Sequence, residues 1–356
     1  YNPWKFTLRS FSQTTTNRKI LPSVKKVKEW KQVDVLKYLQ SIKDELDLSD
    51  KYIDIIKEQE ISGPELLKLT EEKLEDFGIP YGPAMRIVDF TQKFGRKLRA
   101  FSDFKTKDDQ KSVLNKYGVA EIYDLPPFKP EMVKIEDNNI NFQRCLDTIK
   151  SRIDNMGPLI AHKEVVHSKY VDLILQESLQ IAKQLTKKPI RLYPELEIIG
   201  IEASGDVDYA FRLSKMMSNL KELVCITETK RDKEDIGIIQ NIVQLESAFH
   251  SNKRQKGNSY KEDYYDYIYG IMTTAKEWVF IMYTPENVHV SKIYVIELGI
   301  EALIDDSELR KEVKKVMETV VGLLKDRVEV DDSFDSKKKN VKKILSKIDM
   351  YDTLAK

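Results

Sequence analysis

The residues best suited to chemistry lie at the end of an apolar segment, Leu223 to Lys230, which reads LVCITETK. Its apolar, β-branched beginning predicts a buried strand. Glu228 and Lys230 are two positions apart, so an extended backbone places both side chains on the same side. The strand end would then hold a carboxylate beside an ammonium group. On its own such a pair is more often a solvated strand face, because charged residues are mostly exposed.

Further carboxylates precede this strand. Asp206 and Asp208 follow Gly205, after a strand predicted over Leu196 to Glu202. The separation from Asp208 to Glu228 suits one hairpin return. Two carboxylates at a sheet edge can hold Mg²⁺, which prefers hard oxygen ligands and keeps several waters. Such an ion stabilises charge on a phosphate and lowers the pKa of bound water, and a nearby lysine assists. The pattern therefore predicts metal-assisted phosphodiester hydrolysis.

The segment from residue 160 to 285 resembles the PD-(D/E)xK nuclease superfamily, which implies a small mixed α/β sheet flanked by helices. The resemblance implies that Asp208 and Glu228 are Mg²⁺ ligands, with the carbonyl of Thr229 as a third. It also implies that Lys230 is the catalytic lysine. Asp208 is preferred to Asp206 because it fits the VDY element of the family, whereas Asp206 could serve the turn after Gly205.

A glutamine-containing helix is predicted after the lysine, starting at Asp235. Gln240 and Gln244 are four residues apart and so share a face of this helix. Some nucleases of the superfamily carry Gln-x-x-x-Tyr here, and this chain has Gln at the second position. The resemblance implies a catalytic role for Gln244; the alternative is an ordinary solvated face.

The helix that opens this domain, predicted from Glu164 to Thr186, offers one more ligand. Family members often place an acidic residue on it near the metal. Register with the family implies Asp172, with Glu177 as the alternative. Either side chain could instead belong to the helix surface.

Several separate segments also resemble the nuclease-like domain of crinkler-type effector proteins. They read GDVDYAF, CITETK, QLESA, YGIMTTAKEWVF and VMETVVGLLKDRV. Matching motifs do not show that the domain cuts nucleic acid. The alternative is an inactive nuclease fold that acts as a protein-interaction or DNA-binding adaptor.

The region from residue 28 to 98 is predicted to form a compact bundle of five short helices. It resembles the sterile alpha motif (SAM) domain through Trp30, Val33, Asp34, Val35, Tyr38, Leu39, Tyr52, Glu60, Ile61, Ser62, Gly63, Leu66, Leu67, Leu69, Thr70, Leu74, Phe77, Gly78, Ile79, Gly82 and Pro83. The resemblance implies association with other proteins or with itself, head to tail. An acidic surface would then meet Arg86 near the start of the last helix. These charges could equally be ordinary surface residues.

The rest of the chain is read mainly from composition. We expect a disordered basic arm over residues 1–27, a connector over 99–158, the nuclease-like domain over 159–305, a helix over 306–328 and a basic tail over 329–356. In that tail five lysines fall within residues 337–343, which suggests either a nuclear-import signal or a solvated run. The turn-rich basic loop over 250–262 could contact DNA or RNA, and Trp278 could stack on bases, although core packing is the alternative for the tryptophan.

Global properties limit the remaining possibilities. The length of 356 residues predicts two domains, and a net charge of +1 gives no overall attraction to nucleic acid. Two cysteines argue for a reducing compartment, and no apolar run approaches a membrane span. The four histidines, at positions 162, 167, 250 and 289, have no metal-ligand spacing. We expect an intracellular protein that does not bind membranes.

Overall fold

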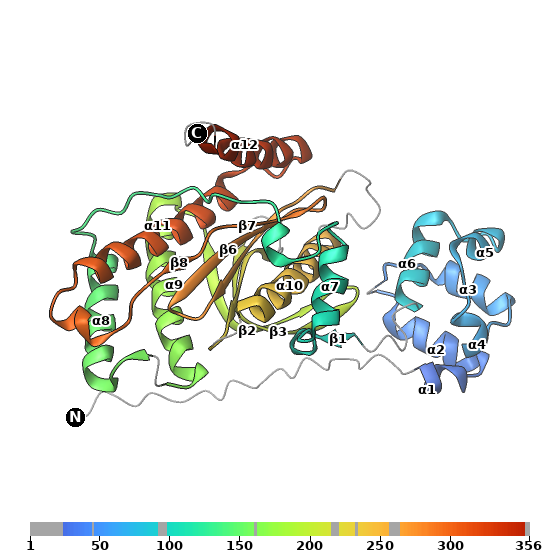
Figure 1. Ribbon diagram of the computed structural model, residues 1–356. Helices are drawn as coiled ribbons and strands as arrows, with labels where there is room; N and C mark the ends of the chain where they lie inside the picture. Colours follow the sequence, from blue (N-terminus) through green and yellow to red (C-terminus); the bar gives the residue numbers. More distant parts are fainter. Residues whose placement is uncertain are drawn as a thin grey trace, which may run out of the picture. The chain divides into compact units, whose positions relative to one another are not determined.

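The computed structural model describes residues 24–44, 46–91, 98–159, 162–214, 221–231, 234–255 and 264–352. The chain divides into two compact units, Tyr1–Lys97 and Leu98–Lys356 (Figure 1). The basic arm expected over residues 1–27 lies almost wholly outside the described residues. Each unit is considered by itself.

The first unit is a bundle of short helices. They are α1 (Val24–Lys28), α2 (Gln32–Ile42), α3 (Asp50–Glu58), α4 (Gly63–Leu66), α5 (Glu71–Asp76) and α6 (Tyr81–Thr91). Leu39, Ile56 and Leu74 are fully buried in its core. A Cβ at Gly63 would lie 1.7 Å from the Val27 carbonyl oxygen, so only glycine permits this approach between α1 and α4. The five helices expected over 28–98 correspond to α2 to α6.

Local hydrogen bonds define the ends of these helices. The Thr70 hydroxyl accepts from the Lys73 backbone at the start of α5, as a capping residue does. Arg86 on α6 donates to the carbonyl oxygens of Leu46 and Asp47, at 2.7 and 2.8 Å. Its guanidinium group thus joins α6 to the α2–α3 loop within the same unit.

The second unit is built on one mixed sheet. Its strands are β1 (Arg99–Ala100), β2 (Ile190–Ile199), β3 (Ala203–Ser214), β4 (Lys221–Thr229), β5 (Ile268–Thr273), β6 (Glu277–Tyr283), β7 (Val288–Val290) and β8 (Tyr294–Val295). The order is β1-β3-β4-β5-β6-β7, with β2 also paired to β3 and β8 to β6. Strand β4 is antiparallel to β3 and parallel to β5, which makes it a central strand.

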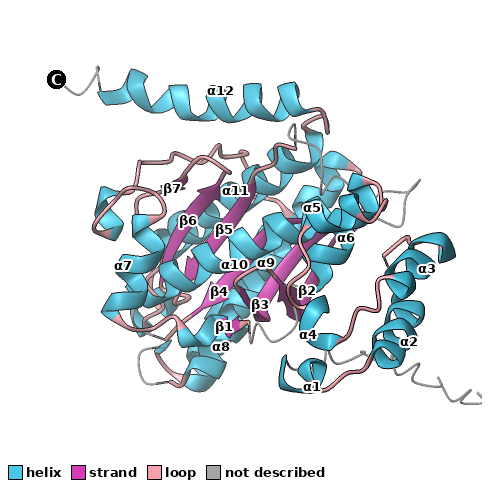
Figure 2. Ribbon diagram, turned by 90° about the vertical axis from the view of Figure 1, so that its right-hand side faces the viewer, coloured by secondary structure: helices cyan, strands magenta, loops and turns pink. Residues whose placement is uncertain are grey.

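Helices cover both faces of this sheet. They are α7 (Lys107–Asn115), α8 (Ile140–Met156), α9 (Glu164–Thr186), α10 (Glu234–Gln255), α11 (Ser307–Glu329) and α12 (Phe334–Asp352). Apolar residues of α8, α9 and α11 form one core against the sheet, and those of α7 and α10 form another (Figure 2). The result is three layers, with β4 between two cores. No helix among the described residues is long and apolar enough to cross a membrane.

Two expectations differ from the structure. The expected connector, residues 99–158, belongs to the second unit: β1 pairs with β3, and α8 packs against α9. The expected basic tail forms helix α12, and Lys337 within its lysine cluster is fully buried. Both segments are fixed by contacts with residues far away in the sequence, which their composition does not reveal.

Candidate active site

Strands β3 and β4 part at the position where the predicted carboxylates lie. Their ladder ends at the pair Tyr209–Thr227, one residue before Asp208 and Glu228. Beyond that point the backbone N–H of Thr229 donates to the Asp208 carboxylate, at 2.6 Å, and not to a carbonyl of β3. Strand β4 keeps its pairing with β5 through Thr229. The opening between β3 and β4 is therefore closed by a side chain.

Both carboxylate oxygens of Glu228 have a partner. Lys230 Nζ lies 2.5 Å from one oxygen, and Gln244 Nε2 donates to the other, also at 2.5 Å. Only 6% of Glu228 is exposed. The structure thus brings together Asp208, Glu228, Lys230 and Gln244, the residues selected from the sequence as catalytic.

The charges at this site are not balanced. Burial and the charge of Glu228 together raise the pKa of Asp208 to about 6, against the opposing effect of the Thr229 N–H. Burial lowers the pKa of Lys230, but the charge and hydrogen bond of Glu228 outweigh that effect and raise it overall. Lys230 is therefore an ammonium group at neutral pH, facing two carboxylates that repel each other.

Helix α10 holds Gln244 against the sheet. Asn241 Nδ2 donates to the Ile226 carbonyl at 3.3 Å and to Gln244 Oε1 at 3.2 Å. These bonds leave the Gln244 amide nitrogen directed at Glu228. The approach depends on Gly270 in β5, since a Cβ there would lie 2.1 Å from Asn241 Oδ1. A glycine in β5 thus lets α10 reach the end of β4.

The other residues selected from the sequence have different partners. Glu177 forms an ion pair with Arg144, at 2.5 Å. Asp172 bonds to the Gln176 side chain, and burial raises its pKa. Gln240 donates to the carbonyl oxygen of Phe104, at 3.3 Å. It therefore contacts the segment before α7 and not the carboxylates.

Three further residues proposed from the sequence lie within the described part of the chain. Asp206 is exposed on β3, whereas Thr229 is buried and supplies the N–H that Asp208 accepts. Trp278 is completely buried and donates to the Ala275 carbonyl at 2.8 Å, so it belongs to the core and base stacking is excluded. Most of the basic loop expected over 250–262 lies outside the described residues.

The sequence analysis missed Glu164 and His167, at the start of α9. The charge of Glu164 acts on both Asp208 and Lys230, which makes it the acidic residue of this helix nearest the site. His167 is buried, and its Nδ1 lies 2.7 Å from the Thr274 carbonyl oxygen. Glu164 precedes the apolar positions of its helix and has no motif around it, so only its position in the fold identifies it.

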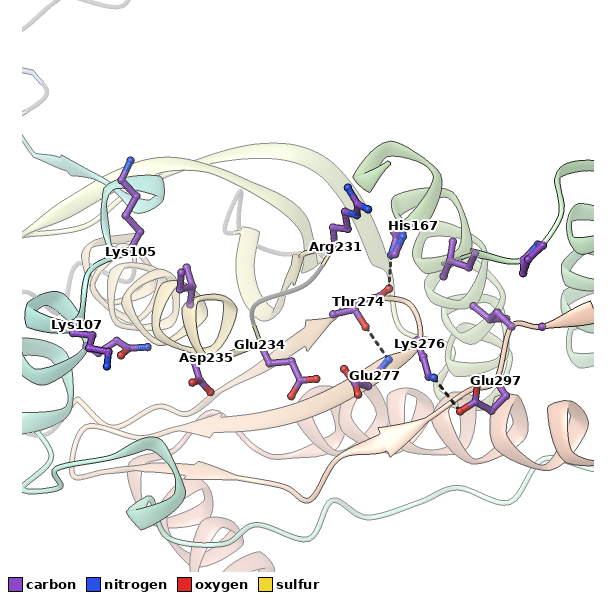
Figure 3. A pocket seen from close by; sticks show the side chains of 16 residues that line it. Lys105, Lys107, His167, Arg231, Glu234, Asp235, Thr274, Lys276, Glu277 and Glu297 are labelled. Atoms are coloured by element: carbon purple, nitrogen blue, oxygen red, sulfur yellow. Dashed lines mark hydrogen bonds and ion pairs between the residues drawn. The ribbon is translucent and has the colours of Figure 1, made fainter. Parts of the chain in front are cut away.

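A cavity of about 740 Å³ adjoins the site (Figure 3). His167, Arg231, Glu234, Thr274 and Glu277 are among its lining residues, which come from α9, the β4–α10 segment, the start of α10, the β5–β6 turn and the start of β6. Asp208, Glu228 and Lys230 do not line it. Arg231, the residue after Lys230, lines the cavity, so the cavity lies next to the end of β4.

Within the described part of the chain, no group of three or more His, Cys, Asp or Glu residues is arranged to hold a metal ion. The oxygen donors at the end of β4 are the two carboxylates of Asp208 and Glu228. Mg²⁺ is commonly held by one or two carboxylates while it keeps several waters. A set of hard oxygen donors with excess negative charge fits that kind of ion.

Comparisons with known proteins agree with a chain of two parts. Residues 6–93 match a family model described as a SAM-like domain. A region covering 73% of the chain is 26% identical to Crinkler effector protein 1 of Rhizophagus irregularis, over 53% of that protein. A region covering 26% of the chain is 29% identical to the mouse Sterile alpha motif domain-containing protein 9-like, over 6% of that protein. The chain thus contains a SAM-like domain, is similar to a crinkler effector, and spans about half of that effector's length.

Proposed function

We propose that this protein is an effector-like nuclease in which a SAM-like unit recruits protein partners and the second unit hydrolyses nucleic-acid phosphodiesters. The observation that carries the proposal is the meeting of Asp208, Glu228 and Lys230 at one end of β4. A mixed sheet with helices on both faces is compatible with the PD-(D/E)xK architecture. The similarity to a crinkler effector supports the effector-like role.

The carboxylates are the proposed ligands of Mg²⁺. Asp208 and Glu228 would hold it, with the Thr229 carbonyl beside them. Bound there, the ion supplies charge stabilisation on the phosphate and a water of lowered pKa. The support is electrostatic: Glu228 and burial both raise the pKa of Asp208, and a divalent cation would relieve that repulsion. Asp172 and Glu177, which have other partners, are not proposed as ligands.

Lys230 has the geometry of a group that stabilises negative charge. Its ammonium lies 2.5 Å from Glu228, and the Glu228 charge keeps it protonated. It can donate to a phosphate oxygen or to the attacking water without first gaining a proton. Gln244 fixes the other Glu228 oxygen, so this carboxylate cannot rotate away. We therefore assign positioning to Gln244 and charge stabilisation to Lys230.

The test is cleavage by the purified full chain. Single-stranded and duplex DNA and RNA are incubated with Mg²⁺ or Mn²⁺, and Glu228→Gln and Lys230→Met are compared with the parent. We expect each variant to lose activity by about 10²-fold or more. The matched control is Lys150→Met, which removes an ion pair of 2.6 Å between α8 and Asp306, the residue before α11. This control should keep full activity.

Two other outcomes would contradict the nuclease proposal. If the parent binds nucleic acid but cuts none of the substrates with either ion, and Glu228→Gln binds equally well, the unit is an adaptor and not an enzyme. A parent that neither binds nor cuts overturns the role in nucleic-acid chemistry altogether. Circular dichroism on every variant shows that loss of activity is not loss of fold.

The SAM-like unit supplies the proposed protein contact. Glu72, Glu75 and Asp76 on α5 are exposed acidic residues, which a basic partner surface could meet. Arg86 is bonded to two carbonyls of its own unit, so self-association through Arg86 would require breaking those bonds. Light scattering tests the point: if the unit self-associates, deletion of residues 1–97 lowers the number of chains per particle, so the mass of the particle falls by more than the mass of the deleted residues. An unchanged number of chains per particle would favour a different protein as the partner.

A further inference from the structure

The cavity beside the end of β4 has the size and position of a ligand site. Its volume of about 740 Å³ lies within the range of small-molecule pockets, roughly 300 to 1,000 Å³. Thr274 and Arg231 line it; Thr274 follows the last residue of β5, and Arg231 follows Lys230. The backbone N–H of Lys230 donates to the Thr273 carbonyl at 2.9 Å, so the two chain segments are fixed to each other. A ligand in the cavity would lie next to the proposed catalytic residues.

His167 supplies a hydrogen-bond acceptor there. The Thr274 carbonyl oxygen can only accept, so the His167 Nδ1, at 2.7 Å from it, carries the proton. In the neutral ring Nε2 is then left with its lone pair. Nε2 has no hydrogen-bond partner among the described residues, although His167 is only 6% exposed. Buried polar atoms without a partner are uncommon, so this atom is suited to accept from a ligand donor.

The charged lining of the cavity consists of four cations and four carboxylates: Lys105, Lys107, Arg231 and Lys276, and Glu234, Asp235, Glu277 and Glu297. Glu234 and Glu277 share a hydrogen bond and therefore a proton, and Figure 3 shows the two carboxyl groups side by side. Lys276 is neutralised by Glu297, at 3.1 Å. Lys107, by contrast, has no carboxylate partner within the described residues, and neither does Arg231. Exposed cations at the cavity and a buried acceptor inside it suit a ligand with a phosphate and a ring N–H.

Apolar surface completes the lining. Pro158, Leu159 and Leu298 also line the cavity. A planar ring can pack on such surface while its edge meets a polar group, as in most small-molecule sites. Phosphate, ring and ring-edge donor occur together in a nucleotide.

We propose that this cavity receives one unstacked nucleotide beside the bond to be cut. The base donates to His167 Nε2, and the phosphate lies near Lys107 and Arg231. The inference rests on the proposed nuclease function and specifies its substrate. Because a nucleotide within a duplex must leave the stack to enter such a pocket, single-stranded or locally unpaired nucleic acid is the preferred substrate.

Binding is tested without cleavage. AMP, CMP, GMP and UMP are titrated into the full chain in the presence of a chelator, and binding is followed by NMR or calorimetry. We expect at least one of the four to bind in the millimolar range or tighter. His167→Phe should weaken that binding about tenfold, because the base loses its acceptor. The matched control is His289→Phe: His289 is also buried with an unpartnered ring nitrogen, but it does not line the cavity.

A second pair of variants tests the phosphate contact on the surface, where folding is not at risk. Lys107→Ala should weaken binding of the nucleotide and leave binding of the matching nucleoside unchanged. Lys111→Ala, on the same helix and also exposed, should change neither. If His167→Phe fails to fold, this pair still decides the proposal.

The outcomes separate the cavity from the catalysis. No binding of any of the four nucleotides, or equal binding by the parent, His167→Phe and Lys107→Ala, overturns the nucleotide pocket. Nucleotide binding without any cleavage in Mg²⁺ or Mn²⁺ overturns the nuclease function and leaves the pocket. Cleavage of duplex at least as fast as single strands contradicts the preference for an unstacked nucleotide.

Discussion

Strand β4 carries a buried carboxylate near each end, and the two have opposite surroundings. Glu222, near the start, lies with Asp266 against Arg327 and Lys337, all between 0 and 2% exposed. Glu228, at the end, lies with Asp208 against a single partly exposed ammonium, Lys230. In the first group the two buried carboxylates face two cations, with the half-exposed Asp332 3.5 Å from Lys337 at its edge, whereas the second group has an excess of negative charge. A buried cluster whose charges are balanced needs no further ion. A cluster with excess negative charge at a strand end would be stabilised by a bound cation.

The pKa values follow the same division. Burial lowers the pKa of Arg327, but the charges of Asp266 and Glu222 raise it well above its usual range overall. Asp208 has no comparable partner, and its pKa is raised. Perturbed carboxylates with insufficient compensation are typical of functional sites, while compensated ones are typical of structure.

The largest expected effect is on the balanced group. Arg327→Met leaves Glu222 and Asp266 buried with only Lys337, and removing one partner of a buried ion pair typically costs about 3 to 5 kcal/mol. We expect the free energy of unfolding of the second unit, measured by urea denaturation, to fall by that amount. The control is Lys325→Met, which removes an exposed pair with Glu329 on the same helix, at 3.4 Å, and should change it little. A loss no larger than the control's would mean that the group is not structural.

The substitution Asp208→Asn should change the free energy of unfolding in the opposite direction. A carboxyl whose pKa is raised to about 6 in the folded state favours folding below its unfolded pKa and loses that contribution as the pH rises through about 6. With a chelator at neutral pH, the substitution should therefore stabilise the second unit by up to about 3 kcal/mol, and at acidic pH by almost nothing. Asp206→Asn, exposed on the same strand, is the control. A destabilised variant at neutral pH would show that the site is not strained by its charges.

A smaller effect is expected from Gln244→Ala. Glu228 then loses its hydrogen-bond donor while it stays buried, which costs about 1 to 3 kcal/mol. The free carboxylate oxygen should also lower the rate of cleavage. Gln240→Ala, one turn earlier and also buried, loses only a 3.3 Å bond to Phe104 and should retain the rate. Equal rates for the two variants would remove Gln244 from the site.

The smallest effect concerns the cavity. The hydrogen bond to Glu277, with burial, raises the pKa of Glu234 to about 7. The stability contributed by this shared proton is present at acidic pH and is lost as the pH rises through about 7. Glu234→Gln keeps a donor without titrating, so its urea midpoint should vary less than the parent's between about pH 5 and about pH 8. Glu297→Gln, which pairs with Lys276, should leave the parent's pH dependence in place.

The sequence predicted the unbalanced group better than the balanced one. Alternation along an extended strand was enough to place Glu228 and Lys230 on one side, and the resemblance added Asp208 and Gln244. Glu164 and His167 were missed because helix α9 carries several acidic residues, and only its packing against β4 and the β5–β6 turn selects these two. The histidine was set aside because it lacks metal-ligand spacing, and that criterion does not identify a residue proposed to act as a hydrogen-bond acceptor.

The balanced group was invisible for a different reason. Glu222 and Arg327 are 105 positions apart, and Lys337 stands in a run of lysines that resembles a solvated tail. Lys337 is buried because Asp266 and Glu222 lie opposite it, and the sequence around Lys337 does not indicate these partners. The same reasoning applies to residues 99–158, whose charged composition suggests a spacer although β1 and α8 are part of the sheet and its core.

The two charged groups also have a combined consequence for strand β4 itself. Sliding the strand by one residue would turn every side chain to the opposite face, removing Glu228 from Gln244 and Glu222 from Arg327 at the same time. A strand with only apolar side chains would tolerate such a shift better, because Leu, Val and Ile can replace one another. Glu222 and Glu228, near the two ends of β4, therefore specify one alignment of this strand with β3 and β5. The alignment that buries Glu222 is also the one that assembles the candidate site.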